Sequence, residues 1–114
     1  MESDAVARLL DEAASFRQSG FEGKARVTCR LASASSLRIL FDYFGEQLSA
    51  GSSFDLIRFA SEKQFIPDEI KQLLSHFSQK VDENFQLPGD VDLLKDAIKL
   101  HQWTMSKVNG AEIP

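Results

Sequence analysis

Residues 25–44 read ARVTCRLASASSLRILFDYF, and this stretch decides the fold. Placing successive residues about 100° apart, as in an α-helix, puts small and apolar side chains on two neighbouring faces. One face holds Ala25, Cys29, Ala32, Ser36, Ile39, Leu40 and Tyr43. The other holds Val27, Ala34, Leu37, Phe41 and Phe44. Because such a helix has to be covered on two sides, we predict a long helix over residues 23–44 at the centre of an all-helical protein, ended by Gly45.

The middle of this helix, ASASS at residues 32–36, contains only small side chains. Short side chains let another helix approach more closely than the usual ~8–10 Å between axes, so we predict the tightest helix–helix contact here. Ser36 lies on the first face, and its hydroxyl is expected to bond back to a carbonyl one turn earlier. On that basis Ser36→Leu overpacks the contact and Ser36→Ala is nearly neutral.

Two helices are predicted beside the long one. The preceding helix runs from a Ser3 cap to about Gln18 and stops at Gly20, because glycine is common just past a helix end. On the other side, residues 46–52 are rich in Ser and Gly, which indicates a loop. A short helix is then predicted from a Ser53 cap.

Two more helices complete the chain. One opens near Pro67, since proline is tolerated in the first turn. Its apolar stripe is Ile70, Leu73, Leu74, Phe77, Val81 and Phe85. The other begins at an Asp90 cap and ends at Asn109-Gly110. Its core positions are Leu94, Ala97, Ile98, His101 and Met105.

The sequence therefore predicts an all-α, compact five-helix up-and-down bundle. A chain of 114 residues that is 43% hydrophobic and 26% charged suits a single folded domain over residues 1–114. We expect residues from about 3 to 108 to be ordered, followed by a loose C-terminal tail.

Charge and cysteine content narrow the classes of function. The longest nearly apolar stretch, Leu37–Phe44, is far too short to cross a bilayer, and the acidic N-terminus differs from a secretory signal. Because Cys29 is the only cysteine, we expect a reducing, cytoplasmic setting. The net charge of −4 disfavours nucleic acid as a partner but allows a local basic patch.

One basic patch is present on the long helix, where Arg26 and Arg30 lie one turn apart and Lys24 is close by. Arginine forks match phosphate oxygens, so these three residues are candidates for binding a phosphate or nucleotide. The alternative is a solvent-exposed ladder, because Glu22, Arg26 and Arg30 are spaced i, i+4 with the acid on the N-terminal side. We favour the ladder, since charge rows of this kind are usually surface features.

No pattern in the sequence indicates catalysis, a metal or another cofactor. His76 and His101 lie in or beside the apolar stripes of their helices without further ligands at zinc spacing, so packed histidines are expected. Cys29 falls on the core face with no base near it in sequence, which favours a small buried side chain. Phosphate-binding P-loops and Gly-rich dinucleotide turns are absent from the sequence.

The order of these segments resembles the HEPN-like superfamily of small helical proteins. The resemblance rests on the long helix, ARVTCRLA at 25–32 and LRIL at 37–40, and on VDENFQLPGD at 81–90, which leads into the last helix. It implies an antiparallel bundle that usually dimerises through the long helices and the last helix. In active members, an Arg followed four to six residues later by His cleaves RNA without a metal ion. No arginine in this sequence has a histidine at that distance, so the resemblance implies a non-catalytic member.

We therefore expect a non-catalytic helical module that forms a homodimer and binds a protein partner, rather than an enzyme. The candidate interface residues are Leu37, Phe41, Phe44 and Trp103. The alternative is an RNA- or nucleotide-binding subunit that uses the basic patch described above.

Overall fold

The predicted central helix is present, and ten of its 22 residues are buried. The computed structural model describes residues 2–46, 48, 51–78 and 91–110. Helix α2 spans Glu22–Tyr43. Its buried residues are Ala25, Thr28, Cys29, Ala32, Ser33, Ala34, Ser36, Leu37, Leu40 and Phe41. Gly20, just before α2, and Gly45, just after it, have positive φ angles of 86° and 73°, which glycine adopts at little cost.

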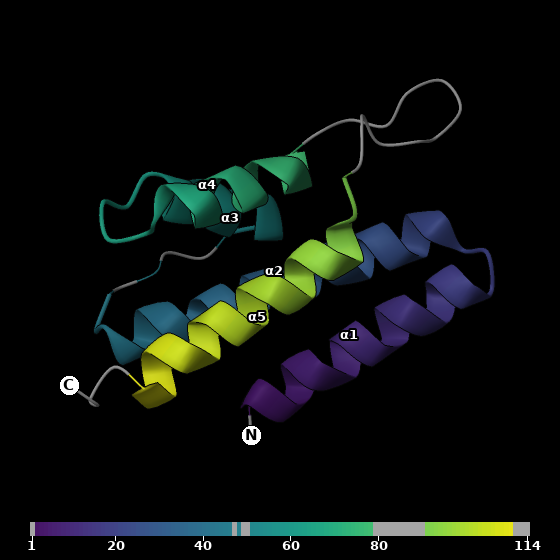
Figure 1. Cartoon of the computed structure of the whole chain (residues 1–114), viewed down its shortest axis with the longest axis horizontal. Coiled ribbons are helices and arrows are strands. Elements are labelled where there is room, and N and C mark those ends of the chain that lie inside the picture. The colour runs from purple at the N-terminus through teal and green to yellow at the C-terminus, as the bar shows by residue number, and fades with distance from the viewer. Residues whose placement is uncertain (1, 47, 49–50, 79–90, 111–114) are drawn as a thin grey trace.

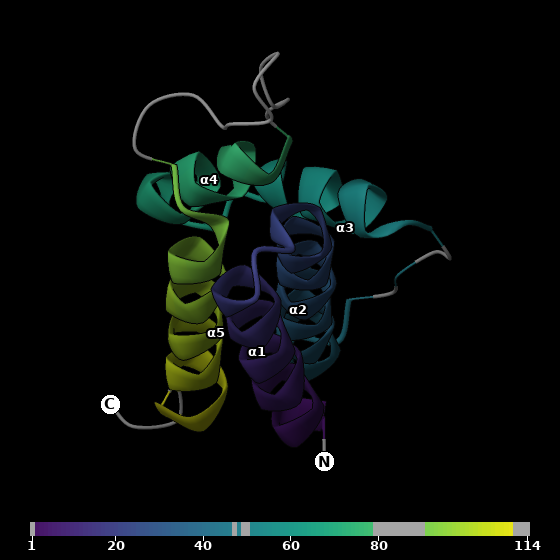
Figure 2. The ribbon, with the colours of Figure 1, turned by 90° about the vertical axis from the view of Figure 1, so that its right-hand side faces the viewer.

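Three long helices lie together, and two short helices pack across them (Figures 1 and 2). Helix α2 contacts both α1 (Glu2–Gln18) and α5 (Leu93–Gly110). Helix α3 (Ser53–Ser61) packs on α2. Helix α4 (Asp68–Ser75) continues into the 3₁₀ turn η1 (His76–Ser78) and contacts α3 and α5. The prediction that α2 must be covered on more than one side is confirmed, but Val27, predicted on the second face, is 54% exposed because it lies near the start of α2.

All five predicted helices are present, and the described residues form no strand, so the all-α fold is confirmed. The direction of the chain does not alternate strictly. Helices α2 and α5 run the same way, because α3 and α4 carry the chain back between them (Figure 1). None of the described helices is long and apolar enough to span a membrane.

Two predicted helix caps are wrong by one residue or more. Helix α1 begins at Glu2, so Ser3 lies inside the helix. Helix α3 is capped by Ser52, whose hydroxyl accepts the backbone N–H of Asp55 while the Asp55 carboxylate accepts that of Ser52. This reciprocal capping box has Asp where Glu or Gln is usual, so the sequence pattern did not distinguish Ser52 from Ser53.

The buried face of α5 also differs from the prediction. The buried residues are Leu93, Ala97, Leu100 and Thr104. Ile98, predicted in the core, is 39% exposed. The apolar residues of this helix extend around more than one face, so periodicity alone did not show which face α1 and α2 would cover. The predicted cap, Asp90, lies outside the described residues.

The stripe predicted for α4 is confirmed where the structure describes it. Ile70, Leu73 and Leu74 are buried, and so is Phe77 in η1. They belong to one hydrophobic core that also includes buried side chains of α2, α3 and α5. Two further predicted members, Val81 and Phe85, lie outside the described residues.

Candidate functional site

Ser36 is fully buried, as predicted, but the predicted bond of its hydroxyl is wrong. Its Oγ lies 3.2 Å from Nδ1 of His101 on α5, rather than on a carbonyl of α2. Burial lowers the pKa of His101 below its usual value. Burial thus favours the neutral imidazole, and the Ser36 hydroxyl and His101 Nδ1 lie within hydrogen-bond distance between α2 and α5.

His76 is also engaged inside the molecule. Its Nδ1 lies 2.8 Å from Oδ2 of Asp96, and this largely buried pair links η1 to α5. Within the described part of the chain, no three His, Cys, Asp or Glu side chains gather closely enough to hold a metal ion. Both histidines therefore serve as contacts between elements in this structure.

Cys29 is buried in the core, in agreement with the prediction. Burial raises the pKa of its thiol to about 11. Because the thiolate is the nucleophilic form, the folded chain holds Cys29 in its unreactive state near neutral pH.

An ion pair that the sequence did not predict joins the end of α1 to the start of α5. The Arg17 guanidinium donates to both carboxylate oxygens of Asp92, with N–O distances of 2.8 and 3.2 Å. This hydrogen bonding lowers the pKa of Asp92 and raises that of Arg17. The same carboxylate accepts the backbone N–H groups of Leu94 and Lys95, so Asp92 caps α5. The two residues lie 75 positions apart, and no local sequence signal connects them.

The predicted basic patch lies on α2, and its cations contact the protein itself. The Lys24 ammonium lies 5.1 Å from the ring centre of Phe21. Arg30 donates its Nε hydrogen to the Phe77 carbonyl at 3.0 Å, and its guanidinium lies 5.0 Å from the ring centre of Phe54. Burial, and then the charge of Arg26, lower the pKa of Arg30. The structure thus ties Arg30 to η1 and α3, which neither the phosphate site nor the surface ladder anticipated.

Two of the four predicted interface residues lie in the core. Leu37 and Phe41 are fully buried, and Phe41 packs edge-on against Phe59 of α3 with ring centres 5.3 Å apart. Periodicity marked both as apolar but did not show that the chain's own core would enclose them. Trp103 is partly buried against the core, whereas Phe44 is 48% exposed.

Phe44 belongs to an exposed group of rings, which we call the aromatic surface and define as Tyr43, Phe44 and Phe65. The ring centres of Tyr43 and Phe44 are 5.2 Å apart, and those of Phe44 and Phe65 are 5.1 Å apart. Tyr43 and Phe65 are 45% and 42% exposed. Sequence analysis placed Tyr43 on a covered face and did not select Phe65, which lies in the connection before α4.

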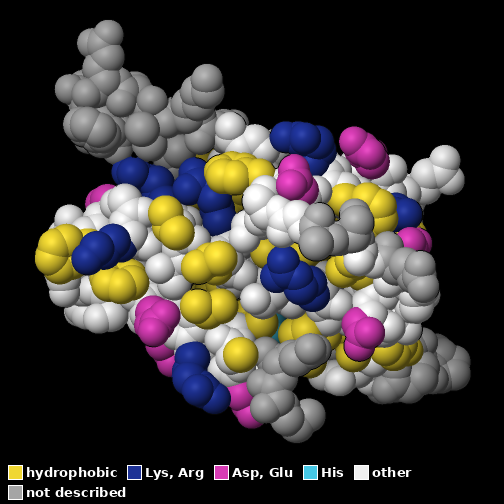
Figure 3. All heavy atoms as spheres, turned by 180° about the vertical axis from the view of Figure 1, so that it is seen from behind, with side chains coloured by type: hydrophobic (Ala, Val, Ile, Leu, Met, Phe, Trp, Pro, Cys, Tyr) yellow, Lys and Arg dark blue, Asp and Glu magenta, His cyan; other side chains and the backbone are white. Residues whose placement is uncertain are grey.

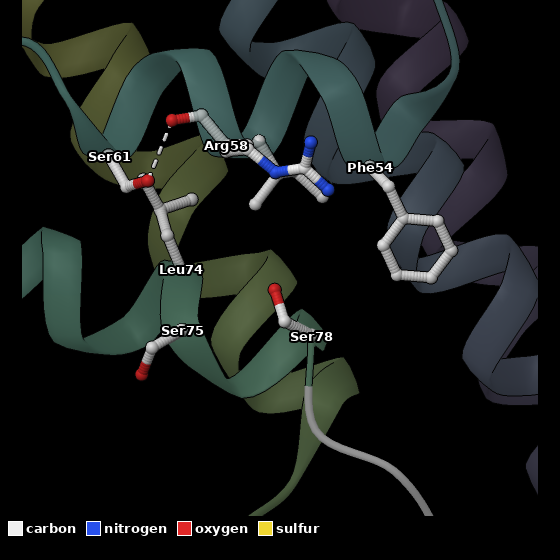
Figure 4. Close-up of a pocket in the computed structure, with 7 residues that line it drawn as sticks. Phe54, Arg58, Ser61, Leu74, Ser75 and Ser78 are labelled. Carbon is white, nitrogen blue, oxygen red and sulfur yellow. Dashed lines mark hydrogen bonds between the residues drawn. The ribbon is translucent and has the colours of Figure 1, made fainter.

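A pocket of about 350 Å³ lies between α3 and the α4–η1 segment (Figure 4). We call it the α3–α4 pocket. Its lining residues are Phe54, Ile57, Arg58, Ser61, Leu74, Ser75 and Ser78. The Arg58 side chain extends into the space between the two elements, and the Ser78 hydroxyl points toward it (Figure 4). Sequence analysis did not select these residues as a site, because the pocket forms only when two helices pack together.

The chain matches no protein-family model, no curated protein and no solved structure.

Proposed function

We propose that this chain is a non-catalytic helical module that associates with a second copy of itself through the aromatic surface. The observation that carries the proposal is the exposure of three contacting rings, Tyr43, Phe44 and Phe65, each more than two-fifths accessible. Aromatic side chains contribute strongly at protein interfaces, and clustered exposed apolar groups mark interaction sites.

The charges beside the aromatic surface suit a self-complementary contact. Lys63 Nζ lies 3.3 Å from Glu46 Oε2 and 4.4 Å from the ring centre of Phe59. Phe59 contacts the buried ring of Phe41, which in turn contacts Phe65 of the aromatic surface. A two-fold interface brings the same patch together from both subunits. Two copies would thus place aromatic rings at the centre and an acid–base pair of each copy at the rim, with no net repulsion between them.

A relationship to HEPN-like proteins would imply dimerisation as well, although through other parts of the helices. It rests on two long helices, a short helix, a proline-led helix and a last long helix in that order. The direction of α5 along α2 and the enclosure of Leu37 by the chain's own core mean that the proposed dimer uses the end of α2 rather than its middle.

Sedimentation velocity over about 1–200 µM tests this proposal, because weak homodimers dissociate in that range. We expect the mass to rise from monomer to dimer with concentration. Phe44→Glu places a charge at the centre of the aromatic surface and is expected to weaken association by at least about 30-fold, the size of a hot-spot effect. The matched control is Phe21→Glu, since Phe21 is equally exposed but lies at the opposite end of α2.

A monomer at every concentration would refute the proposal. So would a dimer that Phe21→Glu disrupts and Phe44→Glu leaves intact, because the contact would then lie at the start of α2. Circular dichroism of both variants establishes that each is folded.

The second candidate function is binding of RNA or a nucleotide at Lys24, Arg26 and Arg30. One observation favours it: burial, and then the charge of Arg26, lower the pKa of neighbouring Arg30, and a bound phosphate would offset the part that is due to Arg26. Fluorescence anisotropy with a single-stranded RNA at low and high salt tests it, since phosphate contacts weaken steeply with salt. Binding that survives Arg26→Gln, or that Arg38→Gln abolishes equally, would dismiss this patch.

A further inference from the structure

The α3–α4 pocket combines one cation with apolar walls, and it is separate from the aromatic surface. Phe54, which is 45% exposed, supplies most of the accessible hydrophobic surface, because Ile57 and Leu74 are buried, and Arg58 supplies the charge. A concave site lined mostly by apolar groups, with a few polar groups that fix orientation, is the usual form of a small-molecule site. Binding at this pocket would not depend on the proposed dimer.

Arg58 is available to a ligand. Its guanidinium forms no ion pair with the residues that the structure describes. Asp55, one turn earlier on α3, is engaged by the backbone N–H of Ser52 in the capping box.

The three serines of the pocket differ in whether their hydroxyl hydrogens are already donated within the protein. Ser61 donates its hydroxyl hydrogen to the Arg58 carbonyl, and Ser75 donates to the Gln72 carbonyl. Their hydrogens are therefore used within their own helices. Ser78 points toward the Arg58 guanidinium (Figure 4), so these two residues form the donor pair of the pocket.

We propose that the α3–α4 pocket binds a small organic acid. Its carboxylate lies against the Arg58 guanidinium and the Ser78 hydroxyl, and its apolar body lies against the exposed ring of Phe54. A carboxylate matches the single cation in charge and accepts two parallel N–H bonds from a guanidinium. The volume of about 350 Å³ is roughly twice that of a cavity that takes benzene, so a phenylalkyl acid fits.

The test is a titration of the full chain, followed by ¹H–¹⁵N NMR, with 3-phenylpropionate, its neutral amide and inorganic phosphate. We expect shifts that centre on the amides of Ile57, Arg58, Ser75 and Ser78. The acid should bind at least about tenfold more tightly than the amide, since a charge-assisted bond to arginine is worth that factor or more. Phosphate, which lacks an apolar body, should bind more weakly than the acid.

Arg58→Gln removes the positive charge of the pocket and keeps a polar side chain in the same place. It should reduce the affinity for the acid to that for the amide and leave the amide unchanged. Arg38→Gln, at an exposed arginine on α2, is the matched control and should change neither. Equal affinity for acid and amide, tighter binding of phosphate, or shifts outside the pocket would each overturn the proposal. A monomeric chain that binds the acid would refute the dimer alone.

Discussion

The Ser36 hydroxyl shows how one small polar side chain fits inside a helical core. It is fully buried, and it lies within hydrogen-bond distance of a single imidazole nitrogen on another helix. A buried hydroxyl that keeps its hydrogen-bond partner contributes about 1 kcal/mol to the stability of the folded protein. If the hydroxyl is removed, the buried partner loses its hydrogen bond, which costs a similar amount.

We therefore predict that Ser36→Ala destabilises the protein by about 1 kcal/mol, because it removes the partner of His101 Nδ1. Ser36→Leu should cost more, about 1–3 kcal/mol, through overpacking. Urea denaturation at pH 7.5 measures both. The control is Ser35→Ala, next to it on α2 and only partly buried. Equal stability of Ser36→Ala and Ser35→Ala would show that the contact with His101 contributes nothing.

Cys29 gives a prediction about alkaline pH. Its pKa of about 11 in the folded chain lies above the 9.0 of an ordinary thiol, which it regains on unfolding. Its contribution to stability is thus fully present below about pH 9 and is lost as the pH rises toward 11. Cys29→Ala should remove this part of the alkaline slope, measured by urea denaturation between pH 8 and about 11.

A thiol reagent at about pH 8 checks the same residue independently. Its reaction with Cys29 should proceed only through opening of the structure and should become fast in urea. Immediate labelling of the native protein would contradict the burial of this side chain.

At the level of the helices, Asp92 makes two kinds of contact at the start of α5. It caps the helix and pairs with Arg17 at the end of α1. Asp92→Ala loses both and should cost about 1–2 kcal/mol, whereas Asp92→Asn keeps the cap and should cost less. Thermal denaturation of the two variants beside Arg17→Ala separates the cap from the ion pair. If Asp92→Ala loses no more stability than Arg17→Ala, the cap contributes nothing measurable to the stability of the fold.

The Asp92 carboxylate also predicts a response to acid. Its pKa lies below the ordinary 3.8, chiefly because Arg17 donates to it. The pair therefore stabilises the fold above about pH 4, and this stability is lost as the pH falls through the lowered pKa. In Arg17→Ala the loss on acidification should be smaller, which denaturation between about pH 2 and 5 measures.

For the whole molecule, the helical periodicity of the sequence was enough to predict five helices and the buried small residues of α2. Helix starts were less certain, because adjacent serines compete as caps at α3. Contacts between helices, such as Ser36 with His101 and Arg17 with Asp92, depend on which faces meet, and no local pattern encodes that. The α3–α4 pocket was unpredictable for the same reason.

Helix α5 is separated from α1 and α2 along the chain by α3 and α4, and this long connection affects the order in which the helices fold. Helices α1 and α2 meet across a short turn, but Arg17 and Asp92 close a loop of 75 positions. Closing a long loop costs more chain entropy before any contact repays it, so local pairs form first. We expect α1 and α2 to pair early and α5 to dock late. Ala13→Gly should then slow refolding, whereas Ala97→Gly, at an equally buried position of α5, should mainly speed unfolding.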